Sequence, residues 1–390
     1  MAAVGQPSTA GLVDRVRALV PMLRDRAPGA ERARRVPAES FDALSEAGVF
    51  KMTAPKRFGG YEADFQTQCD VLAEVARGCP STSWVSTIFS AMSWLVGVFP
   101  DETQQEILGS GDPRIAGVFS PTGTATPKDG GFVVKGRWGF NTGCAGAEWT
   151  VVNAVAPGDS GPGMPMCVLV PSRELTFLDD WHASGMAATG SNTVVANDVF
   201  VPAHRVLPLP ALIEARYPER HNSHNPYFNY PLAAVLTANA GGTPVGIARG
   251  AYQAFFERLP GRPITYTDYT NQAEAPVTHL QVGEAALTID SADAHVRRAA
   301  ALLDDVNGAL SLEARVKVRA HIAYATGLAR EAVDLLFYSS GASCIQAQVP
   351  IQRYQRDIQA LANHAILHPQ TSFELYGRVL CGLKPNTPLY

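Results

Sequence analysis

Apolar residues recur every three to four positions along the first third of the chain, which is the spacing of amphipathic helices. Three stretches with this spacing are predicted as helices: Leu12–Leu23, the segment from Pro37 to Gly48, and Phe65–Arg77. Pro21 is expected to kink the end of the first of these helices.

A nearly uninterrupted apolar run, Trp84–Phe99, follows the helix start at Pro80. It is shorter than the roughly 20 residues that cross a bilayer, and Ser and Thr interrupt it, so it predicts a buried core helix and no membrane span. Asp101 then caps a short helix that ends at Gly109. We expect residues 1–111 to form a helical N-terminal domain.

The pattern changes after the turn-forming sequence GSGDPR to short runs in which apolar and polar residues alternate. Five runs bounded by Gly, Pro, Asp or Asn are predicted as strands: GFVVKGRWGF, WTVVNAVA, MCVLVP, LTFLDDW and TVVANDVFVP. They predict a compact antiparallel β-domain over residues 112–210.

The helical spacing returns at Leu232, after a Pro-, Asn- and His-rich connecting loop at residues 211–231. Four long amphipathic helices are predicted: Leu232–Leu259, Ala275–Val306, Glu313–Ser339 and Ile351–His368. They predict an antiparallel four-helix bundle over residues 232–390. The order of helices, β-domain and bundle defines an α+β fold.

Composition narrows the function classes. The chain has 390 residues, of which 46% are hydrophobic and 17% charged, with a net charge of -4. It can therefore bury a large core, and it has no basic patch of the kind that nucleic-acid binding requires. The N-terminal sequence lacks an apolar signal-peptide core, and the six cysteines form no CxxC pair. We expect a cytoplasmic protein with free thiols.

The common catalytic motifs are missing from the sequence. There is no GxGxxG after a strand, no GxxxxGK[ST], no GxSxG and no HExxH. Two histidine pairs remain, His221 with His224 in the connecting loop and His364 with His368 on the predicted last helix. The second pair has the spacing of one helix face, but neither pair has a visible third ligand, so we expect no metal site.

Four segments resemble the acyl-CoA dehydrogenase family. They are GRWGFNTGCAGAEWTVVNAV, VFSPTGTATP, FFERLPGRP and QRYQRDIQALANH, and the resemblance covers about Leu12 to Leu383. It implies the same plan of helical domain, central β-domain and C-terminal four-helix bundle. In a dehydrogenase, a Glu eight residues after the Arg-Asp pair removes the substrate proton. Here Arg356-Asp357 is followed at that position by Ala365, which has no proton acceptor.

A branch of that fold, the two-component flavin-dependent monooxygenases, is more similar. The segments WHASGMAATGSNTVVANDVFVP and VPIQRYQRDIQALANHAILHP resemble its motifs, although Ala187-Ala188 stands where many members have Arg-Gly. The resemblance implies a homotetramer that takes reduced flavin, FMNH2 or FADH2, from a separate reductase. With O2 it would form a C4a-hydroperoxide and hydroxylate a phenolic or polycyclic aromatic small molecule.

The same resemblance implies the site residues. His364 is expected to be the catalytic base, because a neutral imidazole can accept a phenol proton. Thr142 is expected to hydrogen-bond the flavin N5 and Ser120 its pyrimidine edge. The remaining expected flavin contacts are Asn141, Phe140, Thr189, Ser191 and, at the phosphates, Arg258. Trp84 and Trp138 are expected substrate walls, and Tyr227 and Phe228 are added to them from the connecting loop, because their aromatic rings suit a flat substrate. The alternative for the hydroxyl residues is an ordinary turn or strand position, and the alternative for the aromatic residues is plain core.

Three further functions stay open at this point. The chain could be a dehydrogenase of acyl-CoA substrates with a relocated base, an N-oxygenase of an amino substrate, or a non-catalytic assembly protein with a degenerate flavin pocket.

Overall fold

The structure is a computed structural model that describes residues 9–158, 163–217, 221–305 and 309–390. Five α-helices build the N-terminal region: α1 Leu12–Ala33, α2 Ala38–Ala47, α3 Phe65–Gly78, α4 Pro80–Val96 and α5 Asp101–Leu108. Helix α1 continues ten residues beyond its predicted end, through Pro21 and Pro28. Its buried residues keep the helical spacing as far as Ala30, so burial of this face offsets the unfavourable prolines.

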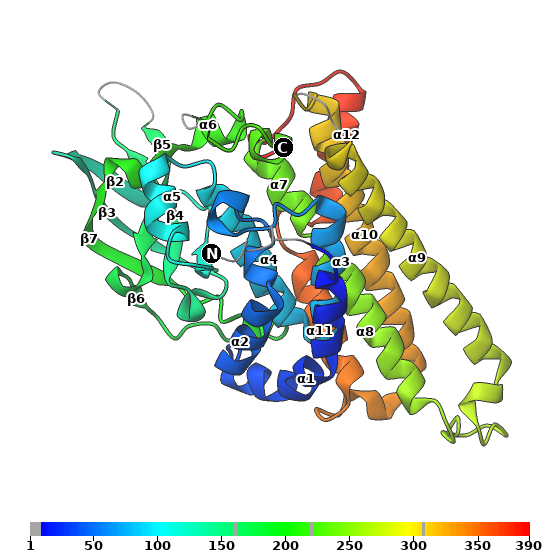
Figure 1. The fold of residues 1–390 in the computed structure, drawn as a ribbon. Coiled ribbons are helices and arrows are strands. Elements are labelled where there is room, and N and C mark those ends of the chain that lie inside the picture. Colours follow the sequence, from blue (N-terminus) through cyan, green and yellow to red (C-terminus); the bar gives the residue numbers. More distant parts are fainter. Residues whose placement is uncertain (1–8, 159–162, 218–220, 306–308) are drawn as a thin grey trace.

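The central region is one eight-stranded sheet. Its strands are β1 Ile115–Gly117, β2 Gly123–Lys128, β3 Gly131–Trp138, β4 Trp149–Ala156, β5 Met164–Pro171, β6 Thr176–Phe177, β7 Val194–Pro202 and β8 Val206–Pro208. The order is β6-β7-β3-β2-β4-β5-β8, and β1 also pairs with β4. The sheet lies beside the helical regions rather than between helix layers (Figure 1).

The sheet is mixed, which corrects the expectation of a purely antiparallel one. Strands β1 and β2 both run parallel to β4, while the other pairings are antiparallel. Strand β4 follows β3 in the chain but lies on the far side of β2, and it runs in the same direction as β2. Strand β6 is shorter than the predicted run LTFLDDW, because only Thr176 and Phe177 pair with β7.

The C-terminal region holds the long helices of the bundle. They are α7 Leu232–Asn239, α8 Gly242–Arg258, α9 Pro276–Asp304, α10 Leu312–Ser339, α11 Pro350–Ala362 and α12 Pro369–Leu380, with the short α6 Leu209–Ile213 before them. The predicted helix Leu232–Leu259 is two helices, and α12 was not predicted. Val306, the expected end of the second helix, lies outside the described residues.

Helix α8 packs unusually close to α3, and glycines make this possible. A Cβ atom on Gly242 would lie 2.1 Å from the carbonyl oxygen of Cys69, and one on Gly246 would lie 2.1 Å from that of Ala73. Since no side chain fits there, these positions accept only glycine, and the N-terminal region and the bundle share one interface.

Helix α4 lies at the centre of the molecule. All but one of its 17 residues are buried, which confirms the predicted core helix. Within the described residues, no helix is both long enough and apolar enough to cross a membrane.

Candidate active site

Three hydroxyl side chains from two distant segments meet in the turn beside β7. Thr142 follows β3, whereas Thr189 and Ser191 precede β7, and all three are buried. The Oγ atom of Ser191 lies 2.9 Å from Oγ1 of Thr142 and 2.7 Å from Oγ1 of Thr189. The structure thus brings together three of the residues that the sequence assigned to flavin.

Asn141 beside them has an unsatisfied side chain. The residue is fully buried, and neither its amide oxygen nor its amide nitrogen has a hydrogen-bond partner in the described part of the chain. An unpaired buried polar group costs about 1–3 kcal/mol. Such a cost is offset when a bound group supplies the missing partners, so Asn141 marks a place where a polar ligand would fit.

Phe140 projects from the same turn. Its backbone has φ 60°, a left-handed conformation, and 73% of the residue is exposed. Its ring stands edge-to-face to that of Trp181, with centroids 5.5 Å apart. An exposed, oriented aromatic ring next to an unpaired amide is suited to covering a flat ring system.

His364 lies outside a helix, which corrects the prediction that it shares a helix face with His368. Helix α11 ends at Ala362, and the backbone N–H of Leu367 donates to the His364 carbonyl in the turn that follows. His368 is the residue before α12. The imidazole of His364 therefore belongs to a turn, and that of His368 belongs to the residue that precedes α12.

The His364 imidazole is held neutral. The residue as a whole is exposed to solvent, while its ring stands against the indole of Trp84. Burial, followed by the positive charge of Arg319, lowers the pKa of His364 to about 4. At neutral pH the ring can therefore accept a proton or a hydrogen bond.

Arg319 on α10 anchors this turn and was missed by the sequence analysis. Its guanidinium donates to the carbonyl oxygens of Ala365 at 2.9 Å and Leu389 at 2.7 Å, and to Oγ of Ser372 at 3.2 Å. Burial lowers the pKa of Arg319. The only sequence signal was a charged residue at a position where the helical pattern expects an apolar one.

Arg258 ends α8 next to a second cationic residue, Arg262. One Arg258 nitrogen donates to Oγ of Ser343 at 3.0 Å, while its Nη1 atom is buried without a partner in the described residues. Arg262, Gly341 and Ser343 line a cavity of about 730 Å³ beside them. Two adjacent guanidinium groups beside a serine hydroxyl suit a phosphate.

Four predicted residues are not brought into contact with the hydroxyl cluster. Trp138 is fully buried in the sheet and donates to the Asn153 carbonyl at 2.7 Å. Tyr227 accepts from Gln68, and Phe228 packs against Gly97, so both lie in the core. These three rings are accounted for by packing, and the geometry gives no support to their assignment as substrate walls.

Ser120, the fourth residue, is exposed between β1 and β2, and its carbonyl accepts from the backbone N–H of Thr122. Of the four predicted substrate walls, Trp84 alone touches a predicted catalytic residue.

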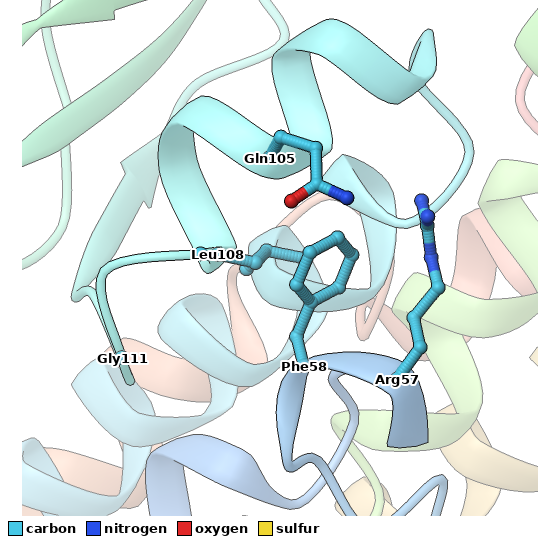
Figure 2. A pocket seen from close by; sticks show the side chains of 6 residues that line it. Arg57, Phe58, Gln105, Leu108 and Gly111 are labelled. Atoms are coloured by element: carbon cyan, nitrogen blue, oxygen red, sulfur yellow. The ribbon is translucent and has the colours of Figure 1, made fainter.

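A different cavity lies between the loop around Phe58 and helix α5 (Figure 2). It measures about 420 Å³, and its cationic group, Arg57, is already paired with Asp101 at 2.5 Å and Gln104 at 2.6 Å. It therefore has no unpaired cation for chemistry. Across the described ranges, no three His, Cys, Asp or Glu side chains are grouped so that they could hold a metal ion.

The fold defines the class of protein. The acyl-CoA dehydrogenase N-terminal domain matches residues 10–108, and the acyl-CoA dehydrogenase C-terminal domain matches residues 239–369. The fold is therefore that of the acyl-CoA dehydrogenases, as the sequence indicated.

Full-length comparisons identify the family more closely. The chain is 34% identical over 377 residues to the oxygenase subunit HsaA, a flavin-dependent monooxygenase of Rhodococcus jostii, covering 95% of this chain and 98% of that protein. It is 32% identical to the oxygenase component of an FADH2-dependent resorcinol hydroxylase of Rhizobium, covering 96% and 95%. The structure of XiaF from Streptomyces in complex with FADH2 and glycerol superposes with a TM-score of 0.89, at 32% identity and with 97% of each chain covered. The chain belongs to the flavin-dependent monooxygenases, as an oxygenase component.

Membership of this family fixes the cofactors as reduced flavin and O2, and it implies a separate flavin reductase. The residues of the site fit a flavin. The unpaired Asn141 amide, the buried hydroxyl cluster and the exposed Phe140 ring suit the isoalloxazine, and the Arg258 region suits a phosphate.

Proposed function

We propose that this chain hydroxylates a phenolic or polycyclic aromatic substrate, with His364 as the base that activates the phenol. The observation that carries the proposal is the neutral imidazole of His364, oriented by Trp84 and by the turn that Arg319 anchors. Relatives named as resorcinol and p-hydroxyphenylacetate hydroxylases support the aromatic substrate class.

The chemistry divides between the flavin and the protein. Bound reduced flavin supplies the two electrons with which O2 yields one oxygen atom for the ring and one for water. The Nε2 or Nδ1 atom of His364 takes the phenol proton, which raises electron density at the ring carbon that is attacked. The phenolate charge stabilises the imidazolium that forms, so a base with a low resting pKa still serves.

The flavin contacts are assigned from the cluster geometry. The hydroxyl of Thr142 hydrogen-bonds the flavin N5, with Ser191 and Thr189 fixing its orientation. Asn141 satisfies its free amide on the flavin ring, Phe140 covers the ring, and Arg258 binds the phosphate. Ser120 stays assigned to the pyrimidine edge. These groups exclude water and so suppress loss of the oxygen as hydrogen peroxide.

The assembly is proposed to be a homotetramer in the cytoplasm, served there by the flavin reductase. Large apolar side chains are exposed along the bundle: Leu280 on α9 at 74%, Tyr338 on α10 at 81% and Leu380 on α12 at 60%. Exposed apolar surface of this kind marks protein contacts, and the helices that carry it are long enough to pair between copies. Sedimentation equilibrium gives the stoichiometry directly.

The central experiment supplies the purified protein with chemically reduced FMN or FAD, ¹⁸O₂ and a panel of phenols and aromatic amines. We expect one ¹⁸O atom in a hydroxylated phenol, and at least a hundredfold less of that product when His364 is changed to alanine. Oxygen on nitrogen would indicate an N-oxygenase. Flavin oxidation with release of all oxygen as peroxide, for every flavin and substrate, would contradict the proposal.

A dehydrogenase and an assembly protein would each give a distinct result. Bleaching of bound oxidised FAD by an acyl-CoA would indicate a dehydrogenase. Absence of binding to any flavin would indicate an assembly protein.

A further inference from the structure

The turn that carries the hydroxyl cluster has a strained backbone. Met186 has φ 54°, a left-handed conformation that is unfavourable for a non-glycine residue. Next to it, a Cβ atom on Gly185 would lie 2.1 Å from the carbonyl oxygen of Arg356. Strained conformations persist only where the surroundings fix them, so something must hold this turn against α11.

Two consecutive side chains of α11 hold it. The carboxyl Oδ1 of Asp357 accepts from the backbone N–H of Met186 at 2.5 Å, and Arg356 donates to the carbonyl oxygen of Ser184 at 2.7 Å. Asp357 is 2% exposed, and Arg356 is also paired with Glu31 of α1 at 2.5 Å. Asp357 and Arg356 therefore bind two backbone groups of the turn, the N–H of Met186 and the C=O of Ser184, which lie two residues apart.

Asp357 is linked to the flavin contacts by hydrogen bonds that meet at Met186, whose N–H donates to Asp357 and whose C=O accepts from the next residue in the series. The Met186 carbonyl accepts from Oγ1 of Thr189 at 2.8 Å. That hydroxyl contacts Ser191, which contacts Thr142. Asp357 is thus connected to the hydroxyl assigned to flavin N5 through the backbone of Met186, which joins the two hydrogen bonds covalently.

The same helix leads to the base. Helix α11 ends at Ala362, and His364 follows in the next turn, its N–H donating to the Leu361 carbonyl at 2.9 Å. Flavin contacts and base therefore lie on segments that Asp357 joins, although the two segments belong to different regions of the fold.

We propose that Asp357, assisted by Arg356, is a positioning residue that holds the flavin-contacting turn, residues 184–191, in place relative to the His364 segment. The inference rests on the flavin site assigned under the proposed function. This role accounts for the buried carboxyl group of Asp357, which contacts the turn through one backbone N–H, that of Met186.

The surroundings of Asp357 make its charge state a useful probe. Burial is the main cause that raises its pKa to about 7, and the hydrogen bond from Met186 opposes the rise. The charged or titratable groups that face it come from three segments: Glu31 of α1, Arg353 and Arg356 of α11, and Cys79 before α4.

The test measures flavin dissociation constants by equilibrium dialysis, with FMN and FAD, oxidised and anaerobically reduced. Asp357→Ala should weaken flavin binding at least tenfold while the far-UV spectrum is kept. Asp357→Asn, which keeps the Oδ1 acceptor, should stay within threefold of the wild type. The matched control is Asp334→Ala, because Asp334 also binds α11, through Gln355 and Gln359, without touching the turn. It should stay within twofold.

The inference would be overturned if Asp357→Ala bound flavin as tightly as the wild type does. It would also be overturned if Asp334→Ala lost as much flavin affinity as Asp357→Ala does. If Asp357→Ala does not fold, Arg356→Ala decides: loss of its hydrogen bond to the Ser184 carbonyl should weaken flavin binding at least threefold, and unchanged affinity would overturn the inference. Thr142→Val separates the two proposals. If it weakens binding and Asp357→Ala does not, only the positioning role fails. If no protein in the set binds flavin, the proposed site fails.

Discussion

The imidazole of His364 stands edge-on to the indole of Trp84, with ring centroids 4.9 Å apart and an interplanar angle of 68°. Trp84 comes from the first turn of α4 and His364 from the turn after α11, so the contact joins the N-terminal helices to the bundle. The indole fixes the plane of the imidazole and removes water from one side of it. A neutral, oriented base follows from that arrangement.

Replacing His364 by alanine should leave flavin binding unchanged and lower hydroxylation at least a hundredfold, because general-base catalysis contributes about 10²–10⁴. Product formation and peroxide release, measured in the same reactions, check this. His368→Asn is the control, since asparagine also starts a helix well, and it should keep activity within threefold. Equal losses in both variants would assign the effect to the fold of the turn.

Thr142→Val removes one hydroxyl at constant volume. We expect more hydrogen peroxide per flavin oxidised and a loss of about 1 kcal/mol in unfolding free energy. Thr150→Val is matched, because Thr150 makes a similar buried hydroxyl contact, 2.9 Å to Ser172, inside the sheet. It should cost similar stability without uncoupling. Uncoupling by both variants would remove Thr142 from the flavin contact.

Arg319→Ala should move the acid limb of the pH–rate profile. The positive charge and the packing of Arg319 help to lower the pKa of His364 to about 4, so their loss raises it toward its ordinary value. Activity needs the neutral ring, and it should therefore fail at a higher pH than in the wild type. The loss of three hydrogen bonds should cost about 2–4 kcal/mol of stability. An unshifted acid limb would show that Arg319 does not act on the base.

The free energy of unfolding should depend on pH because of the buried carboxyl group of Asp357. Its pKa is about 7 in the folded protein and about 3.9 when unfolded, so between these values the folded protein holds a proton that the unfolded chain releases. The free energy of unfolding therefore falls as pH rises from about 4 to about 7. Asn cannot ionise, so Asp357→Asn should gain on the order of 2 kcal/mol relative to wild type between pH 5 and pH 8. Urea unfolding at both pH values measures the gain, and a constant difference would contradict it.

Arg258→Ala should weaken FMN and FAD but spare riboflavin, which carries no phosphate. The test is to measure the dissociation constants of FMN, FAD and riboflavin for the variant and the wild type. Arg249→Ala is a suitable control, because Arg249 is already paired with Asp293 at 3.1 Å. Equal weakening of riboflavin would place Arg258 outside the phosphate site.

The sequence predicted most helices and the order of the three regions, because periodic burial acts locally. It predicted the hydroxyl cluster only by resemblance, since Thr142 and Ser191 are far apart in the chain and their contact depends on how β3 and β7 pair. Helix α12 was missed because a proline usually ends a helix, whereas Pro369 is the first residue of α12.

The anchoring role of Arg319 could not be predicted. Its partners are backbone carbonyls, which every residue carries, so no residue type marks them. Trp138, Tyr227 and Phe228 show the opposite case. Their aromatic rings suggested a substrate pocket, but each is enclosed by the packing of neighbouring helices or strands.

The hydrogen bond from Arg319 to the carbonyl oxygen of Leu389 has a practical consequence. The same guanidinium holds Ala365, the neighbour of His364, so the last residues of the chain share a support with the base. Removing the segment around Leu389 would therefore take away one of the three hydrogen bonds of the guanidinium that fixes the turn carrying the base.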